Sequence, residues 1–413
     1  MALLNTIRRP TPAETGEPTP KLAGVSWELL ILNTLGSTGA QTVVPLPRSV
    51  IQLVTMGALM TAFALALVLN PRLKVRPSAY LMLLSLLLVT SVVASLDLQS
   101  GLGALFRCFR FGLFVVTLWL LTPWWTGSFT FVRRHIRMFG AVLVSVALGL
   151  AVAPGKAMPE SYGGRLAGVV WPLTPPQVGQ YAAVIAGLAA LMWLGQRLAR
   201  RPALLVIVPC LALLLLSHTR TATLGLAAGL VVALLSLALT SARARKVFTT
   251  LVVLGGLSAV VFGGLLETWF LRGQSEENFS SLTGRAKVWD ALLSAPRTVN
   301  EYLFGVGLTD KSYDGLPIDN SWLAVYHEQG FVGVALVASF LLVLIAVAVL
   351  RPPSLARACA IFLITYCVSA SYTEAGLGDA SPYLLHLALA ATLLAQGGGR
   401  VREDEFIPEG RPE

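Results

Sequence analysis

The sequence has 413 residues, of which 55% are hydrophobic and only 13% charged, and its mean hydropathy is +0.72. Soluble globular proteins carry about 25% charged residues, so this composition excludes an ordinary soluble enzyme. A membrane-spanning helix needs roughly 20 apolar residues, and the apolar content suffices for about ten crossings or more. The sequence therefore predicts an all-α, polytopic integral membrane protein.

Apolar runs bounded by charged residues or by Pro and Gly predict twelve membrane spans. The first, from about Val25 to Thr42, is the weakest, because it contains Glu28 and two glycines. The other eleven run approximately from Ser49 to Asn70, Ala79 to Leu96, Leu102 to Leu121, Met138 to Val152, Val178 to Leu194, Ala203 to Ser217, Thr223 to Thr240, Val247 to Leu265, Phe331 to Leu350, Ala358 to Ser371 and Pro382 to Ala395. An even number of spans places both termini on the same side of the membrane.

The Lys and Arg residues that give the net charge of +10 are distributed as this predicted topology requires. Twenty of the 31 Lys and Arg residues fall in segments on the side of the termini, and nine fall in the opposite segments together with thirteen acidic residues. Cytoplasmic loops of membrane proteins carry an excess of Lys and Arg, so both termini are expected in the cytoplasm. Topology therefore accounts for the basic balance, and no nucleic-acid partner is predicted.

The predicted domain organisation follows from these spans. Residues 1–23 form a cytoplasmic tail without the short apolar segment of a cleaved signal peptide. The remaining units are nine spans within residues 24–266, interrupted by an outer loop at 153–177, a large extracytoplasmic loop at 267–330, three spans within 331–396, and a second cytoplasmic tail at 397–413.

The large outer loop is expected to be partly helical. Thr283 is a good N-cap for a helix over residues 284–294, which Pro296 would stop. A second short helix is predicted from about Ser321 to Gln329, leading into the tenth span.

Charged groups at the membrane boundary are costly and therefore mark candidate functional residues. Five arginines of this kind are predicted on or near the outer side: Arg107, Arg110, Arg165, Arg220 and Arg285. The guanidinium group presents a planar fork of donors that matches phosphate oxygens, so together they suit a lipid-linked diphosphate. Each also has a simpler interpretation: a snorkelling or surface charge or, for Arg107 and Arg110, structural pairing between helices with Glu28 as the partner.

Neither a metal nor another cofactor is predicted. The histidines do not form a cluster: His135 is expected in a cytoplasmic turn, His386 in the last span, and His218 and His327 about a hundred residues apart. Gly305-Val306-Gly307 lacks the spacing of a nucleotide-binding loop, so ATP is not expected to supply energy.

The second half of the chain resembles the O-antigen ligase and O-antigen polymerase family of bacterial polytopic glycosyltransferases. Several short motifs, in a fixed order, carry the resemblance. They are the turn from Ser217 to Ala222, Leu282-Thr283-Gly284-Arg285, Leu303 to Leu308, Asp319 to Leu323, and Glu328, Gly330 and Gly333 at the start of a span. Earlier in the chain, Gly164 to Gly168 looks like the first outer loop of the family.

The resemblance implies a C-type glycosyltransferase-like fold in the bacterial cytoplasmic membrane. It also implies metal-independent, inverting transfer of a glycan from an undecaprenyl diphosphate carrier to an acceptor hydroxyl. In ligases of this family, arginines that match Arg220 and Arg285 are associated with the diphosphate. They commonly have a His before the loop Asn, whereas this sequence has Asp319. That departure is compatible with a polymerase, or with a ligase for another acceptor.

The chemistry of the residues agrees with that reaction. Arg220 and Arg285 would stabilise the departing diphosphate, and Asp319 could act as general base or, alternatively, cap the helix near Ser321. Further contacts to sugar or acceptor are expected from Glu374, Asp379, Trp289 and Trp322, although the tryptophans are equally suited to anchoring at the membrane interface.

Two alternatives remain at this point. A transporter or lipid flippase would suit the spans and the charges of Arg107 and Arg110, but transporters place their binding groups near the bilayer midplane, whereas most of these arginines are expected at the outer boundary. Ten-helix peptidoglycan polymerases fit the loop motifs less well. The glycan, the acceptor and the choice between ligase and polymerase are left open.

Overall fold

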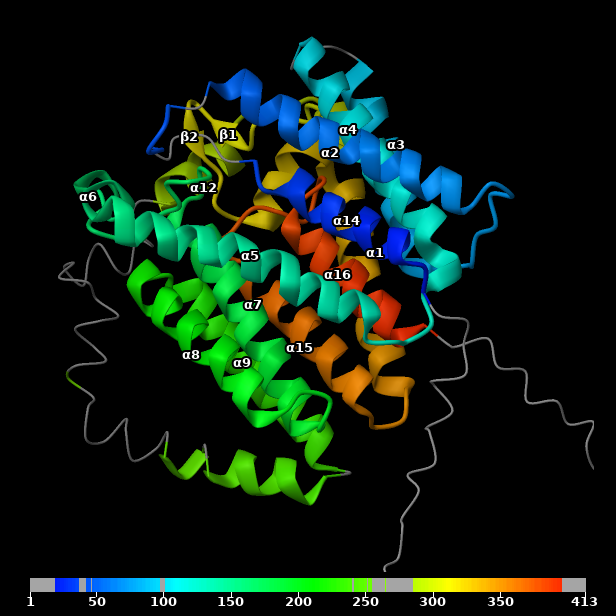
Figure 1. The fold of residues 1–413 in the computed structure, drawn as a ribbon. Coiled ribbons are helices and arrows are strands. Elements are labelled where there is room, and N and C mark those ends of the chain that lie inside the picture. Colours follow the sequence, from blue (N-terminus) through cyan, green and yellow to red (C-terminus); the bar gives the residue numbers. More distant parts are fainter. Residues whose placement is uncertain are drawn as a thin grey trace, which may run out of the picture.

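The protein is a helical bundle in a computed structural model that describes residues 19–36, 42–45, 47–96, 101–239, 241–250, 252–254, 264 and 285–395 (Figure 1). Its helices are α1 (Lys21–Thr34), α2 (Arg48–Leu69), α3 (Ala79–Leu96), α4 (Leu102–Leu121), α5 (Thr130–Val152), α6 (Pro154–Ala157), α7 (Pro175–Leu194), α8 (Arg200–Ser217), α9 (Arg220–Ala238), α12 (Arg285–Ser294), α13 (Val299–Phe304), α14 (Ser321–Leu350), α15 (Leu355–Ala370) and α16 (Pro382–Leu394). The described part also contains a helical segment over residues 242–250, two short 3-10 helices, η2 (Thr122–Trp124) and η3 (Glu160–Tyr162), and one small antiparallel hairpin, β1 (Ser312–Tyr313) with β2 (Leu316–Pro317).

Eight helices within the described residues are long and apolar enough to cross a membrane: α2, α3, α4 together with η2, α5, α7, α8, α9 and α14. The prediction of an all-α, polytopic membrane protein is therefore confirmed, whereas the number of twelve spans stays a prediction. α15 and α16 are apolar but have only 16 and 13 residues. α1 ends at Thr34 after 14 residues, and the predicted ninth span, Val247 to Leu265, lies mostly outside the described residues.

Helix boundaries agree with the apolar runs except where polar residues extend a helix. α3 and α4 have the predicted bounds. α5 begins at Thr130 rather than near Met138, so its first two turns carry the basic residues expected in a connecting turn. His135 is therefore not in a cytoplasmic turn: it is fully buried within α5. Its Nε2 lies 2.9 Å from Nδ1 of His386 on α16, and the indole of Trp27 donates to its Nδ1.

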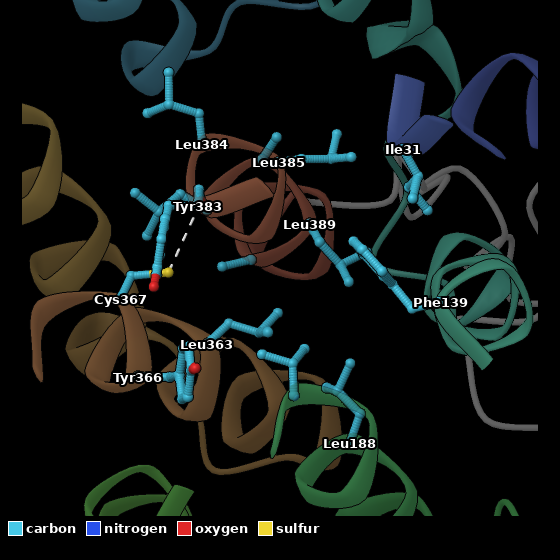
Figure 2. Close-up of a cluster of buried hydrophobic side chains, with 14 of the residues drawn as sticks. Ile31, Phe139, Leu188, Leu363, Tyr366, Cys367, Tyr383, Leu384, Leu385 and Leu389 are labelled. Atoms are coloured by element: carbon cyan, nitrogen blue, oxygen red, sulfur yellow. Dashed lines mark hydrogen bonds between the residues drawn. The ribbon is translucent and has the colours of Figure 1, made fainter. Parts of the chain in front are cut away.

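The interior of the bundle is formed around α15 and α16. Figure 2 shows Ile31, Phe139 and Leu188 directed at this pair from α1, α5 and α7. Almost every residue of α16 is buried, so this short helix is surrounded by protein. On α2, by contrast, Leu53 and Val68 are more than 70% exposed, as expected for side chains that face lipid. The apolar composition thus supplies both a protein interior and a lipid-facing surface.

Small residues allow α15 to approach its neighbours closely. A Cβ atom on Gly187 of α7 would lie 2.0 Å from Phe362 Cζ, and one on Gly229 of α9 would lie 2.8 Å from Phe362 Cδ2. Gly225 makes the same kind of room for Tyr366. Membrane helices associate through such close packing, because lipid supplies no hydrophobic driving force between them.

α14 is two helices joined at a break. Gly330 has φ 63° and ψ −164°, which separates the predicted short helix Ser321–Gln329 from the spanning part. A break leaves helical carbonyl groups without their usual donors. The backbone after α13 supplies replacements: Val306 N donates to His327 O and Gly307 N to Glu328 O, both at 3.0 Å.

We call this contact of Gly305, Gly307 and Gly330 the glycine crossing. A Cβ on Gly305 would lie 2.4 Å from Gln329 N, and one on Gly330 would lie 2.4 Å from the carbonyl carbon of Leu303. All three residues have positive φ. The Gly-Val-Gly motif therefore serves the packing of two backbones.

Candidate functional site

Arg220 stands at the start of α9, directly after a tight turn. The helix α8 ends at Ser217, and the C-cap residue His218 is left-handed with φ 47°. Thr219 Oγ1 donates to Pro175 O at 3.0 Å and accepts from Ser217 Oγ at 3.1 Å. Gly179 of α7 makes room for this turn, because a Cβ there would lie 2.6 Å from Thr219 Cβ. The hydroxyl-rich turn noted in the sequence thus fixes the first residue of α9 at one end of the bundle.

Arg165 reaches the same turn from the loop between α6 and α7. Leu166 N donates to Leu216 O at 3.0 Å, and Arg165 Nε donates to Ser217 O at 3.1 Å. Because these bonds engage the last residues of α8, Arg165 and Arg220 are held on neighbouring segments. The loop motif Gly164 to Gly168 therefore lies against the turn that follows α8.

α12 begins at Arg285 and ends at Ser294, the predicted end. The predicted cap Thr283 and the predicted first residue Gly284 lie outside the described residues. The Nε of Arg285 is 3.1 Å from Asp319 Oδ2. Asp319 does not cap the following helix: Asn320 does, and its Oδ1 accepts from Trp322 N and Leu323 N. The carboxylate of Asp319 is thereby left to orient the guanidinium of Arg285.

Glu374 lies in the turn between α15 and α16, which is bound to the start of α14. Ser321 Oγ donates to Glu374 O at 2.6 Å and accepts from Gly376 N at 3.0 Å. Two further contacts hold the same turn: Trp322 Nε1 donates to Ser371 Oγ at 3.0 Å, and the hydroxyls of Thr221 and Thr373 are 2.5 Å apart. No pattern in the sequence predicts the contact between Thr221 and Thr373.

Arg165, Arg220, Arg285, Asp319 and Glu374 form one group, which we call the arginine cluster. Arg165 interacts electrostatically with Glu374, Arg285 and Arg220, and Glu374 with Asp319, Arg285 and Arg165. Burial lowers the pKa of Arg165, and the positive charges of Arg285 and Arg220 lower it further. Among these five residues, three guanidinium groups face two carboxylates.

Glu374 is the carboxylate most changed by this environment. Its side chain is half-buried, and desolvation, reinforced by the charge of Asp319, raises its pKa to about 7, although Arg285 and Arg165 oppose the rise. A carboxyl group with a pKa near neutrality can gain and lose a proton under working conditions.

Arg107 and Arg110 lie in a different group, on the first half of α4. Arg107 Nη1 donates to Leu308 O at 3.3 Å, and Arg110 Nη2 donates to Asn33 O. Glu28 pairs with Arg134 at 3.0 Å, so the pairing of Glu28 with Arg107 or Arg110 is wrong.

The same group contains the other predicted acidic contact, Asp379. Lys311 Nζ is 2.5 Å from Asp379 Oδ1, and Glu328 Oε1 accepts from Thr309 N and Thr309 Oγ1. Arg110 and Asp379 interact electrostatically, as do Glu328 and Lys311. We call Arg107, Arg110, Lys311, Glu328 and Asp379 the strap cluster, because they surround the backbone segment of the glycine crossing.

The two clusters flank the short helix Ser321–Gln329. Asp319 precedes its first residue, whereas Glu328 is in its last turn. Nine helical residues rise about 13 Å, which sets the scale of the separation. The structure therefore brings Arg165, Arg220 and Arg285 together and places Arg107 and Arg110 elsewhere.

The two predicted sugar-contacting tryptophans differ in their surroundings. Trp322 is engaged with Ser371 in the turn described above. Trp289 is partly buried against a small apolar cluster that includes Leu292, Ile318 and Tyr326. Its Nε1 is buried without a hydrogen-bond partner. Nearby, the guanidinium of Arg297 lies 4.5 Å from the centre of the Tyr326 ring.

The arginine cluster has the chemistry of an anion site with a base. Its guanidinium groups come from three segments far apart in the sequence, and a half-buried carboxyl stands beside them. Such groups can neutralise a diphosphate and accept a proton. Among the described residues, no three His, Cys, Asp or Glu side chains are grouped as a metal site would require.

A comparison with known protein families matches part of this chain. Residues 203–338 match the family model described as O-Antigen ligase, which supports assignment to the O-antigen ligase family. The match begins in α8 and ends in α14, so it includes Arg220, Arg285 and Asp319. A comparison with curated proteins finds no match to this chain.

Proposed function

We propose, from the O-antigen ligase family match over residues 203–338, that this membrane protein transfers a glycan from undecaprenyl diphosphate to an acceptor hydroxyl. The family match and the eight apolar helices support a multi-pass protein of the bacterial inner membrane that acts on glycans. The lipid diphosphate donor, inversion at the anomeric carbon and independence of metal ions are part of the proposal.

The observation that carries the proposal is the convergence of Arg165, Arg220 and Arg285. Burial and mutual repulsion both disfavour three guanidinium groups in one place, as the lowered pKa of Arg165 reflects. An anion with several oxygens removes that repulsion. A diphosphate matches the number and the planar donor geometry of these groups.

The arginine cluster would act mainly on the leaving group. As the bond between the sugar and the diphosphate breaks, negative charge grows on the diphosphate oxygens. Fixed cations stabilise that charge more in the transition state than in the ground state. Arg285 is well suited to this role, because Asp319 engages its Nε and leaves the two terminal nitrogens for the ligand.

The acceptor would approach from the side of the carboxylates. Asp319 and Glu374 both border the cluster, and either could take the proton of an attacking hydroxyl. Trp289, with its unpartnered indole N–H, is placed one helical turn beyond Arg285 and would contact a sugar. Asp379 is engaged by Lys311, so its sugar contact is the least supported of these assignments.

The proposed site would face the outer side of the membrane, with both termini in the cytoplasm. The basic residues at the start of α5 and α8 would then be cytoplasmic, while the ends of the same helices lead toward Arg165 and Arg220. Figure 1 shows α6, α12 and the β1–β2 hairpin together at that second end of the bundle.

The test is transfer by membranes that contain single-residue variants. Arg220→Ala or Arg285→Ala should reduce release of undecaprenyl diphosphate from an undecaprenyl diphosphate oligosaccharide by about 10³-fold or more, since a preorganised charge contact at a transition state is worth several kcal/mol. Lys287→Ala is the matched control, because Lys287 is exposed on α12 two residues from Arg285. Product formation at the control level by both arginine variants would contradict the proposal.

The alternative of a transporter or flippase is distinguishable in the same membranes. A flippase would move the fluorescently labelled lipid-linked oligosaccharide across the bilayer without breaking the bond to the diphosphate. Transport is disfavoured by the position of the arginine cluster, which lies at helix ends, whereas transporters bind near the midplane.

A further inference from the structure

We propose that Glu374 is the general base of this transfer and that Asp319 is a positioning residue for Arg285. This inference rests on the proposed function and assigns the proton-accepting role within it. The sequence favours Asp319 for that role, because it stands beside the loop Asn in a motif of the family. The contacts of the two carboxylates favour the opposite assignment.

The carboxylate of Asp319 is already engaged. Its Oδ2 accepts from Arg285 Nε at 3.1 Å, in an ion pair whose side chains are 27% and 37% exposed. Moving Asp319 onto an acceptor hydroxyl would release the guanidinium that it orients. Asp319 is therefore better suited to holding Arg285 than to accepting a proton.

The carboxylate of Glu374 is available. Among the described residues it has no hydrogen bond or ion pair within contact distance, although its backbone is held at both ends. Ser321 Oγ donates to its carbonyl at 2.6 Å, and its own N–H donates to Ala370 O at 3.0 Å. A fixed backbone with an unengaged side chain beside the guanidinium groups of Arg285 and Arg165 is the arrangement that a base next to a diphosphate site requires.

The charges around Glu374 support the same role. The groups that face it are Asp319 before α14, Arg285 on α12, Arg165 on the outer loop, and the phenols of Tyr366 and Tyr383 on α15 and α16. Desolvation first, and Asp319 second, raise its pKa to about 7. A base with this pKa is largely ionised just above neutral pH and still binds a proton well.

In the proposed step, the acceptor hydroxyl gives its proton to the Glu374 carboxylate while its oxygen forms a bond to the anomeric carbon. The bond between that carbon and the diphosphate oxygen breaks, and its electron pair stays on the diphosphate beside Arg285. Glu374 then releases the proton to water. The products are the glycosylated acceptor, undecaprenyl diphosphate and one proton.

The experiment measures release of undecaprenyl diphosphate from an undecaprenyl diphosphate oligosaccharide by the full-length purified protein, from pH 5.5 to 9. The acceptor is the envelope glycolipid fraction of the producing strain. Glu374→Gln should lower kcat by about 10² to 10⁴-fold, with KM for the donor changed less than threefold. Glu160→Gln, an exposed glutamate in the outer loop, is the matched control.

The pH profile identifies the base. Because the base must be ionised, kcat/KM of the wild-type protein should fall tenfold per pH unit below about pH 7 and level off above it. Glu374→Gln should remove this dependence, whereas Asp319→Asn should retain it. A wild-type profile that is flat from pH 6 to 8, or loss of the dependence in Asp319→Asn alone, would overturn the assignment.

Azide provides a readout that a purely structural role would not give. Azide is a nucleophile that needs no base, so it should restore donor cleavage by Glu374→Gln and form a glycosyl azide. It should not restore cleavage by Arg285→Ala.

If Glu374→Gln fails to insert, Glu374→Asp in the same assay keeps the test: it should be slowed and should retain the pH dependence. Failure of the proposed function itself looks different, because the wild-type protein would then release no undecaprenyl diphosphate at any pH.

Discussion

The arginine cluster and the strap cluster are built from similar residues, yet they differ in what their charges contact. In the strap cluster, Arg107 and Arg110 bind backbone carbonyl groups, and Lys311 binds Asp379 at 2.5 Å. In the arginine cluster, Arg165 also binds a backbone carbonyl and Arg285 pairs with Asp319. Arg165 faces, in addition, the like charges of Arg220 and Arg285. Each cation of the strap cluster named here thus contacts an oxygen of the protein, whereas the arginine cluster brings together like charges whose repulsion a bound anion would relieve.

This difference separates a structural role from a ligand-binding role. Buried charges that satisfy backbone groups hold segments together, and here they secure the chain around the glycine crossing to α3 and α4. Charges that repel one another lower stability until something neutralises them. That division can be tested at the glycine crossing, at the ion pair of the arginine cluster and at Arg107.

The largest effect is expected at the glycine crossing. Gly305→Ala would place a Cβ 2.4 Å from Gln329 N in a backbone with φ 78°. Positive φ and overpacking each cost about 1–3 kcal/mol, so we expect a loss of about 3 kcal/mol or more in unfolding free energy. The measurement is the thermal unfolding midpoint in detergent.

Gly57→Ala in α2 is the control for the crossing, because nothing lies within 4 Å of a Cβ at Gly57. This control should melt at or slightly above the wild-type midpoint, since alanine favours a helix. If Gly305→Ala melts like the control, the crossing is looser than its contacts indicate, and the strap cluster loses the structural role assigned to it.

A smaller effect is expected when the ion pair of the arginine cluster is broken. Asp319→Asn keeps the shape of the side chain but removes the charge that orients Arg285. We expect kcat/KM for the lipid-linked donor to fall about tenfold, which corresponds to about 1.4 kcal/mol. The negative charge of Asp319 raises the pKa of Glu374. Removing this charge should therefore also move the acid limb of the pH profile, the range in which kcat/KM falls as the pH is lowered, to lower pH.

The direction in which the acid limb of the Asp319→Asn profile moves distinguishes an electrostatic role of Asp319 from a structural one. A structural defect alone would lower the rate at every pH and leave the limb in place. Movement of the limb to higher pH would mean that Asp319 does not act on the titrating group as described. Asp290→Asn, which changes an exposed carboxylate on α12, is the control and should leave both the rate and the limb at their wild-type values.

The sequence predicted much of the fold because apolar length is a strong local signal. α3 and α4 have the predicted bounds, and the short helix Ser321–Gln329 precedes a break that Gly330 makes possible. The errors lie where polar residues continue a helix. Arg133, Arg134 and Arg137 were expected in a turn but form the start of α5, because charged side chains are compatible with a helix that extends beyond lipid.

The candidate site was predicted residue by residue but not as a geometry. Arg220, Arg285 and Asp319 are marked by local motifs, and the comparison of families supports the segment that contains them. No local pattern distinguishes Arg165, which joins Arg220, from Arg107 and Arg110, which do not. That distinction depends on which helices are neighbours in space, and hydrophobic patterns do not specify neighbours. The same reason hides the position of Glu374 beside Arg285.

The smallest effect is expected at Arg107, and it decides whether the strap cluster also binds the donor. Arg107→Ala removes one hydrogen bond to Leu308 O, so unfolding free energy should fall by about 1 kcal/mol. If the role is structural, the thermal midpoint drops while KM for the donor changes less than threefold. If Arg107 binds diphosphate, as the sequence alone suggests, KM rises tenfold or more and the midpoint stays near that of the wild type. Arg165→Ala, measured beside it, should raise KM, because Arg165 lies in the cluster whose positive charges a diphosphate would neutralise.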